Sequence, residues 1–164
     1  MREGQLQVNS HGKGLLLGAS SISSSLALTG GAIYGDAGAS IVVTNGTQLN
    51  NNTAITNGGA VSCEGCQALT LQLGSSATFN MAQENGGAIY GDSGASIFVT
   101  NGTQLTHNTA VTNGGAVSCE GCQALMLQLG SSATSNVAQE NGGACYCEGC
   151  TTFQLQQVQL SNNR

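Results

Sequence analysis

The sequence predicts an all-β fold: a parallel β-helix of about six 28-residue turns, each with three short strands. Three observations predict it. Gly-Gly-Ala recurs with a 28-residue period, beginning at Gly30, Gly58, Gly86, Gly114 and Gly142. Short apolar runs alternate with polar residues at a period of two, which is typical of strands. The chain has 25 glycines and only 7% charged residues, a composition that disfavours repeats built from amphipathic helices.

Each repeat offers three candidate strands. In the first clear repeat they lie near 32–34, 40–44 and 49–55, and turn-forming residues separate them at 35–38, 45–46 and 57–58. Residues 30–85 and 86–141 differ at only eight positions, so two kinds of turn alternate.

We expect three regions along the chain. Residues 1–29 are predicted to form a degenerate first turn and an N-terminal cap, in which Leu15 and Leu17 align with Leu71 and Leu73. Residues 30–141 are predicted to form four regular turns, as two 56-residue repeats. Residues 142–164 then form the last partial turn and a C-terminal cap, as expected of terminal repeats.

Stacking explains the low charge. Equivalent residues of successive turns lie directly above one another, where a column of like charges would repel itself but uncharged side chains are tolerated. Asparagine can form hydrogen-bonded ladders along such a column. The sequence predicts two: Asn52, Asn80, Asn108 and Asn136 form one column, and Asn57, Asn85, Asn113 and Asn141 form the other.

One predicted column consists of acidic residues, unlike the uncharged columns. It consists of Asp36, Glu64, Asp92, Glu120 and Glu148. Carboxylates a few ångströms apart must be solvated, have raised pKa values or bind cations. Their glycine-rich turn favours simple solvation. Calcium is the alternative, but the dense ligand loop of a dedicated site is missing, so no resident metal or cofactor is expected.

Six of the seven cysteines form three Cys-Glu-Gly-Cys motifs: Cys63 and Cys66, Cys119 and Cys122, and Cys147 and Cys150. In the stacked arrangement the first motif has glycines above and below it, so a bridge there must close within the motif. The other two motifs lie on adjacent turns, where bridges within a motif or between turns are both open.

Three interpretations of these cysteines compete. Structural disulfides of an extracytoplasmic protein are favoured. Free or reversibly oxidised thiols are the second interpretation. The third is a zinc site with four sulfur ligands, Cys119, Cys122, Cys147 and Cys150. Cys145 replaces a valine of the other turns and is expected to be a small inward-facing residue.

Charge excludes some functions. The net charge of −5 provides no basic surface for nucleic acid, and no segment is apolar enough to be expected to span a membrane. The basic residues are Arg2, Lys13 and Arg164, and the histidines are His11 and His107. The repeat is uninterrupted and these residues form no catalytic set, so the sequence predicts a protein that is not an enzyme.

A binding surface is predicted along the column of Val42, Phe98 and Met126, together with Phe79 and His107. Burial of these residues under a cap or loop is the alternative. The irregularity of the outward columns favours a protein or glycan partner over an ice lattice. Both ends of the rod expose strand edges that could pair with neighbouring subunits.

Two motifs resemble a known family. Gly30–Ile33 and its equivalents, including Gly58–Val61, match the GGA(I/L/V) repeat of chlamydial polymorphic outer membrane proteins. Leu49–Asn52 and Leu105–Asn108 match the companion F-x-x-N motif with Leu in place of Phe, whereas Ala77 and Ala133 stand at that place in the other turns.

The resemblance implies a right-handed β-helix from an autotransporter passenger, exported and used in adhesion. We therefore expect an extracellular or cell-surface module that binds a protein or glycan partner. A structural scaffold or stacking subunit of a larger assembly is the alternative, and ice binding is less favoured.

Overall fold

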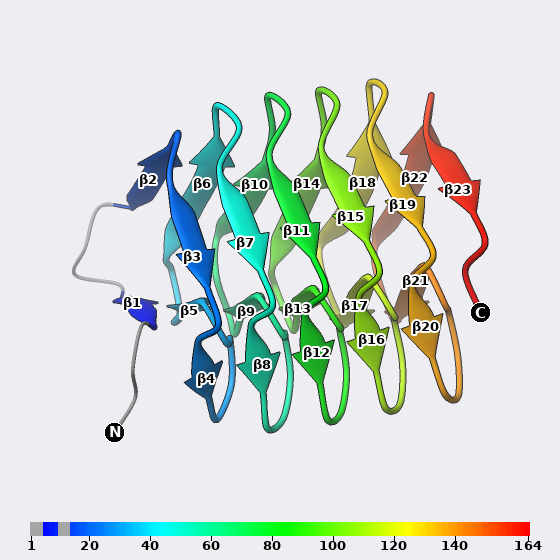
Figure 1. Ribbon diagram of the computed structural model, residues 1–164, viewed down its shortest axis with the longest axis horizontal. Coiled ribbons are helices and arrows are strands. Elements are labelled where there is room, and N and C mark those ends of the chain that lie inside the picture. Colours follow the sequence, from blue (N-terminus) through cyan, green and yellow to red (C-terminus); the bar gives the residue numbers. More distant parts are fainter. Residues whose placement is uncertain (1–4, 10–13) are drawn as a thin grey trace.

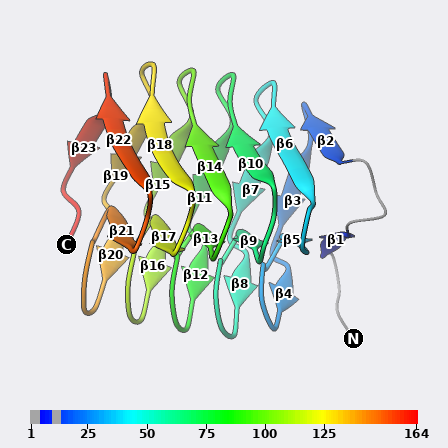
Figure 2. The same ribbon diagram turned by 180° about the vertical axis from the view of Figure 1, so that it is seen from behind.

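The computed structural model describes residues 5–9 and 14–164, and these form a parallel β-solenoid (Figure 1). The described strands make five complete turns and most of a sixth. Strands of successive turns lie side by side along the rod, with the first and last strands at opposite ends of it (Figure 2). The predicted all-β solenoid with 28-residue turns is therefore confirmed.

The first two sheets each contain six strands. The first sheet consists of β1 (Leu6–Val8), β5 (Ile33–Gly35), β9 (Val61–Cys63), β13 (Ile89–Gly91), β17 (Val117–Glu120) and β21 (Cys145–Glu148). The second sheet consists of β2 (Leu15–Gly18), β6 (Ser40–Thr44), β10 (Ala68–Leu71), β14 (Ser96–Val99), β18 (Ala124–Gln128) and β22 (Thr152–Gln156).

The other two sheets follow in each turn. The third sheet consists of β3 (Ser21–Ser23), β7 (Gln48–Asn50), β11 (Ser76–Thr78), β15 (Gln104–Thr106), β19 (Ser132–Thr134) and β23 (Gln159–Ser161). The fourth sheet consists of β4 (Leu26–Ala27), β8 (Thr53–Ala54), β12 (Met81–Ala82), β16 (Thr109–Ala110) and β20 (Val137–Ala138).

The prediction of three strands per turn is wrong, because each complete turn has four. The segment 49–55, expected as one strand, is divided between β7 and β8. Asn51, between them, has a φ of 56°, and this left-handed conformation turns the chain onto a new sheet. The same conformation recurs in every turn at this corner: Ser24, Asn51, Phe79, His107, Ser135 and Asn162.

The core is a set of stacked apolar columns enclosed by the sheets. Along β14 the side chains alternate between half-buried and fully buried, with Ile97 and Val99 pointing inward. The larger fully buried side chains are Ile33, Ile41, Leu49, Leu69, Leu71, Ile89, Ile97, Leu105, Leu125 and Leu127. Burial of each contributes roughly 1.5–3 kcal/mol. The alternation in the sequence therefore indicated the inner face correctly.

The register of the first turn differs from the prediction by two residues. Leu15 pairs with Ile41 and Leu17 pairs with Val43, so Leu17, rather than Leu15, aligns with Leu71. A shift of two keeps the same face inward, and for this reason the apolar pattern did not distinguish the two registers. Part of the predicted N-terminal cap, including Arg2, His11 and Lys13, lies outside the described residues.

The first predicted asparagine ladder forms inside the rod. Asn108 is fully buried, and its Oδ1 accepts hydrogen bonds from the backbone N–H and the side-chain amide of Asn80, both at 3.0 Å. Its Nδ2 donates to the Ala77 carbonyl at 2.9 Å and to Asn136 Oδ1 at 3.0 Å. Asn163 extends this ladder; it was missed because its spacing from Asn136 is 27 rather than 28.

The second predicted ladder forms nearer the surface. The Asn85 N–H donates to Asn57 Oδ1 at 3.0 Å, and the Asn113 N–H donates to Asn85 Oδ1 at 3.2 Å. Asn141 continues it through its side-chain amide, which donates to Asn113 Oδ1 at 2.9 Å. Both ladders therefore tie each turn to the next, as stacking predicts.

A second left-handed corner carries a leucine where other turns have asparagine. Leu73 has a φ of 51° and is half exposed, and Asn45 and Asn101 occupy the equivalent corner. Asparagine adopts this conformation at lower cost than leucine. We expect Leu73→Asn to stabilise the fold by about 0.5–1 kcal/mol, measured by urea unfolding. The matched variant Asn45→Leu should lower stability by a similar amount, and equal stability of both variants would contradict the explanation.

Candidate functional site

The three Cys-Glu-Gly-Cys turns close as disulfides within each motif. The Cα–Cα distances are 5.2 Å for Cys63–Cys66, 5.6 Å for Cys119–Cys122 and 6.0 Å for Cys147–Cys150. All six cysteines of the predicted bridges are therefore paired, and of the two schemes left open for the last two motifs the structure has the one within the motif. Cys145 is a free thiol packed against the core, and burial raises its pKa to about 12.

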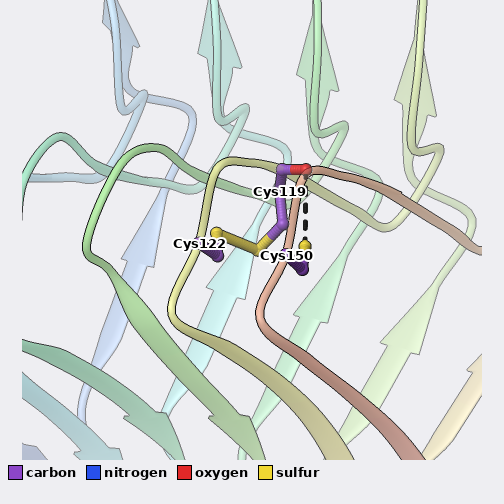
Figure 3. Close-up of side chains that lie close together, drawn as sticks. All are labelled: Cys119, Cys122 and Cys150. Carbon is purple, nitrogen blue, oxygen red and sulfur yellow. Dashed lines mark hydrogen bonds between the residues drawn. A yellow bond between two sulfur atoms is a disulfide. The ribbon is translucent and has the colours of Figure 1, made fainter.

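The last two motifs nevertheless bring sulfur atoms of adjacent turns together. The Sγ atoms of Cys119, Cys122 and Cys150 all lie within 4.8 Å of one another, and Cys150 Sγ lies 3.8 Å from the Cys119 carbonyl oxygen (Figure 3). Cys119 pairs in register with Cys147. The first motif has no such neighbour, because its turn is flanked at the paired position by Gly35 and Gly91.

The predicted acidic column forms along the first sheet, next to these turns. Asp36, Glu64, Asp92 and Glu120 are half-buried and Glu148 is exposed. Glu120 and Glu148 are paired in register. Tyrosine hydroxyls donate to three of the carboxylates: Tyr34 to Glu64 at 3.0 Å, Tyr90 to Glu120 at 3.2 Å and Tyr146 to Glu148 at 2.7 Å.

These tyrosines were missed in the sequence because only alternate turns carry them. The signal was present, since Tyr34, Tyr90 and Tyr146 recur with a 56-residue period, two positions before an acidic residue. Burial, followed by the hydrogen bond to Glu64, raises the pKa of Tyr34 to about 12. Burial also raises the pKa of Tyr90, together with the charge of Glu120. The hydroxyls therefore stay protonated and act as donors to the column.

Asp92, in the middle of this column, has a raised pKa. Desolvation raises the pKa of its carboxyl group, and the Glu64 charge adds to the rise, while a hydrogen bond of 2.5 Å from the Gly65 N–H opposes it. The folded protein therefore binds this proton more tightly than the unfolded chain does. The resulting cost to stability is present above the raised pKa and is relieved as the pH falls toward the unfolded value of about 3.9.

We expect Asp92→Asn to raise the melting temperature at pH 7. The amide keeps an oxygen acceptor for Gly65 and removes the partly buried charge beside Glu64. The gain should vanish below pH 3.9, about the ordinary aspartate pKa, because the wild-type carboxyl group is then protonated too. Glu84→Gln, which removes one exposed charge, corrects for net charge. A gain that is independent of pH would contradict the argument.

The predicted column of Val42, Phe98 and Met126 lies on the second sheet. All three side chains are half-buried and alternate with inward-facing neighbours, so they point away from the core, and Thr70 separates Val42 from Phe98 in register. Phe98 pairs in register with Thr70 and Met126. This column is therefore a partly apolar outer surface rather than part of the core.

Phe79 and His107 occupy the corner between the third and fourth sheets. Phe79 is 58% exposed, and its ring stacks on the imidazole of His107, with ring centroids 4.9 Å apart and planes inclined by 15°. The pair borders an open groove of about 600 Å³. The remaining lining residues are Thr109, Ser135, Val137, Asn162 and Arg164.

The structure adds an apolar surface that sequence reasoning did not assemble. Outward-facing apolar side chains gather on and beside the fourth sheet, whose strands lie in order along the rod (Figure 1). We call this surface the apolar face, and its exposed members are Leu26, Leu28, Ile55, Phe79, Met81 and Val111. Its strands are only two residues long, too short for alternation to reveal them.

The comparisons with known proteins identify the repeat. The Chlamydia polymorphic membrane protein repeat matches residues 46–64. This segment contains the Leu49–Asn52 motif, whose Asn52 belongs to the buried ladder, and the Gly58–Val61 motif that leads into β9. The search of curated proteins and the search of solved structures each gave no match.

The repeat implies an outer-membrane or surface-associated protein. Over the residues described, no helix has the length and apolar character needed to cross a membrane. The matched segment lies in a solenoid of 28-residue turns, and residues 102–120 repeat it closely, 56 residues further along the chain. The chain is therefore a β-solenoid that contains, at residues 46–64, a segment similar to the Chlamydia polymorphic membrane protein repeat.

Proposed function

We propose that this solenoid is a non-catalytic adhesion module at the cell surface, and that it binds a protein or glycan partner through its apolar face. The repeat family, which is usually non-catalytic and surface-associated, supports this proposal. The exposure of Ile55, Phe79 and Met81 supports it further, because exposed apolar surface of this kind commonly marks an interaction site.

The observation that carries the proposal is the distribution of differences between the two 56-residue repeats. All eight differing positions are half-buried or exposed in both copies, and every fully buried position carries the same residue in both. Five of the eight pairs lie at the third and fourth sheets: Asn50/Thr106, Asn51/His107, Ile55/Val111, Phe79/Ser135 and Met81/Val137. The core is held constant while most of the outer differences fall at the third and fourth sheets, as expected of a recognition surface.

The repeat supplies substitutions that the fold already accommodates. Phe79→Ser and Met81→Val each introduce the residue present at the equivalent position, Ser135 or Val137. We expect this double variant to lose most binding of the purified protein to cultured host cells and to a glycan array, with an unchanged circular dichroism spectrum. The matched control is Phe98→Val with Met126→Thr, which makes the corresponding exchange on the second sheet. If the control loses binding and the apolar-face variant keeps it, the proposed surface is wrong.

The alternative is a scaffold or stacking subunit of a larger assembly, in which strands of a terminal turn would pair with a neighbouring subunit. Phe153, Leu155 and Leu160 lie on β22 and β23 and are each more than 40% exposed. The outer edges of these strands offer backbone hydrogen-bonding groups to a further turn in parallel register. Absence of cell and glycan binding, together with end-to-end polymers in electron micrographs, would favour a stacking subunit over an adhesion module.

A further inference from the structure

The stacked Cys-Glu-Gly-Cys turns place three sulfur atoms close together and a fourth bonded to one of them. The Sγ atoms of Cys119, Cys122 and Cys150 lie within 4.8 Å of one another (Figure 3), and Cys147 is bonded to Cys150. The two turns are held in parallel register by the Cys119–Cys147 pairing and by a backbone hydrogen bond of 2.7 Å from the Gly121 N–H to the Glu148 carbonyl. The scaffold therefore fixes the spacing of the two turns whether or not the sulfurs are bridged.

This spacing is close to that of a tetrahedral zinc site. A Zn–S bond of ~2.3 Å places the four sulfurs of such a site about 3.8 Å apart. The Cys150 sulfur needs to approach those of Cys119 and Cys122 by no more than about 1 Å. The Cys147 sulfur, which is bonded to that of Cys150, lies outside this group of three and moves further. The bonded pairs part on reduction, and rotation about χ1 can supply these movements. Thiolate sulfur is the ligand type that zinc prefers in closed, four-coordinate structural sites.

The surroundings suit a structural metal rather than a catalytic one. Cys119 and Cys122 are fully buried, and both belong to the apolar core. Cys147 and Cys150 pack against that core. The carboxylates between the cysteines, Glu120 and Glu148, accept hydrogen bonds from the hydroxyls of Tyr90 and Tyr146. Four sulfurs are thus available as ligands.

We propose that the reduced form of this protein binds one zinc ion through Cys119, Cys122, Cys147 and Cys150. The oxidised form, with two disulfides, has no thiolate ligands and does not bind it. A dithiol delivers two electrons to each disulfide and is itself oxidised to a disulfide, which leaves four thiols at this site. Zn²⁺ then forms four Zn–S bonds and displaces four protons. Zinc therefore binds only when the four cysteines are reduced. This proposal does not depend on the proposed binding function.

Cys63 and Cys66 provide a control within the same chain. They form the same motif and the same kind of disulfide, but glycines occupy the paired position on both adjacent turns. When reduced, this turn offers only two sulfurs, too few for a closed zinc site. The proposal therefore predicts one metal ion per chain. Binding at each motif separately would instead give three.

The test is titration of the reduced protein with Co²⁺, a spectroscopic substitute for zinc. Thiol titration of the denatured protein defines the starting states: one thiol, Cys145, before reduction and seven after it. The reduced protein is separated from the dithiol under nitrogen. We expect one equivalent of Co²⁺ to give the d–d absorption of a tetrahedral thiolate complex, and one equivalent of Zn²⁺ to abolish it. The oxidised protein should give no such absorption.

Paired variants assign the ligands. Cys63→Ser with Cys66→Ser should leave the titration unchanged. Cys119→Ser with Cys122→Ser, and separately Cys147→Ser with Cys150→Ser, should weaken binding by at least about a hundredfold, since even outer-shell changes cost 10–100-fold. Cys147 and Cys150 lie in the last described turn, so serine substitutions there leave the contacts between the earlier turns intact. This variant therefore still tests the proposal if the Cys119 and Cys122 variant folds poorly. Absence of the absorption in the reduced wild type, or its retention in either stacked-turn variant, would overturn the proposal.

Discussion

Gly87→Ala is expected to destabilise the solenoid by at least about 3 kcal/mol, at the upper end of what overpacking costs. A Cβ atom at Gly87 would overlap the Gly115 carbonyl oxygen and lie 2.6 Å from the Thr109 nitrogen. Both atoms belong to the backbone of the next turn, so no side chain can rotate away, and the turns must separate. Urea unfolding followed by circular dichroism measures the loss.

The control for this variant is Gly102→Ala. Gly102 has a φ of +75°, and no atom lies within 4 Å of the place where the added methyl group would sit, so the substitution costs only the left-handed strain of about 1–2 kcal/mol. Hydrogen exchange should also show reduced protection between β12 and β16 in Gly87→Ala alone. If the two variants unfold at the same urea concentration, close contact between turns does not explain why the Gly-Gly-Ala motif has glycine at its second position.

Asn108→Ala is expected to cost about 3–5 kcal/mol, because it removes four hydrogen bonds inside the rod, and a buried polar group left unsatisfied costs about 1–3 kcal/mol. The Asn80 N–H loses its acceptor, and the Ala77 carbonyl and Asn136 Oδ1 lose a donor. The measurement is again urea unfolding.

Asn141→Ala is the matched comparison in the other ladder. Asn141 is exposed and donates one side-chain hydrogen bond to Asn113 Oδ1 at 2.9 Å, so its loss should change stability by less than about 0.5 kcal/mol. Comparable losses for Asn108→Ala and Asn141→Ala would show that burial of the ladder is not the source of its contribution.

The fold could be predicted because repetition makes one local pattern visible many times. The spacing of Gly-Gly-Ala set the length of a turn, and the alternation along segments such as 40–44 set the inner face. The ladder through Asn52 and Asn80 followed from stacking alone. These features depend on residue type and periodicity, which the sequence contains directly.

The fourth strand and the site details could not be predicted in the same way. The division at Asn51 depends on a backbone conformation that Phe79 and His107 also adopt, although bulky residues rarely do so. The apolar face arises from two-residue strands brought side by side, and its members Ile55 and Met81 belong to different turns. Pairing of the stacked cysteines depends on side-chain rotamers, which register alone does not determine.

The alternation of two kinds of turn has a consequence for how such a chain can change in length. Each turn contacts only its neighbours, so excision of residues 86–141 would join residue 85 to 142 and recreate the junction that 141 and 142 now form. Recombination between the near-identical halves would thus shorten or lengthen the rod in 56-residue steps without a new interface. Excision of residues 86–113 would instead stack the Cys63 and Cys66 turn directly on that of Cys119 and Cys122. The 56-residue period therefore determines which cysteine turns meet, and a single-turn deletion would change the sulfur chemistry of the protein while preserving its fold.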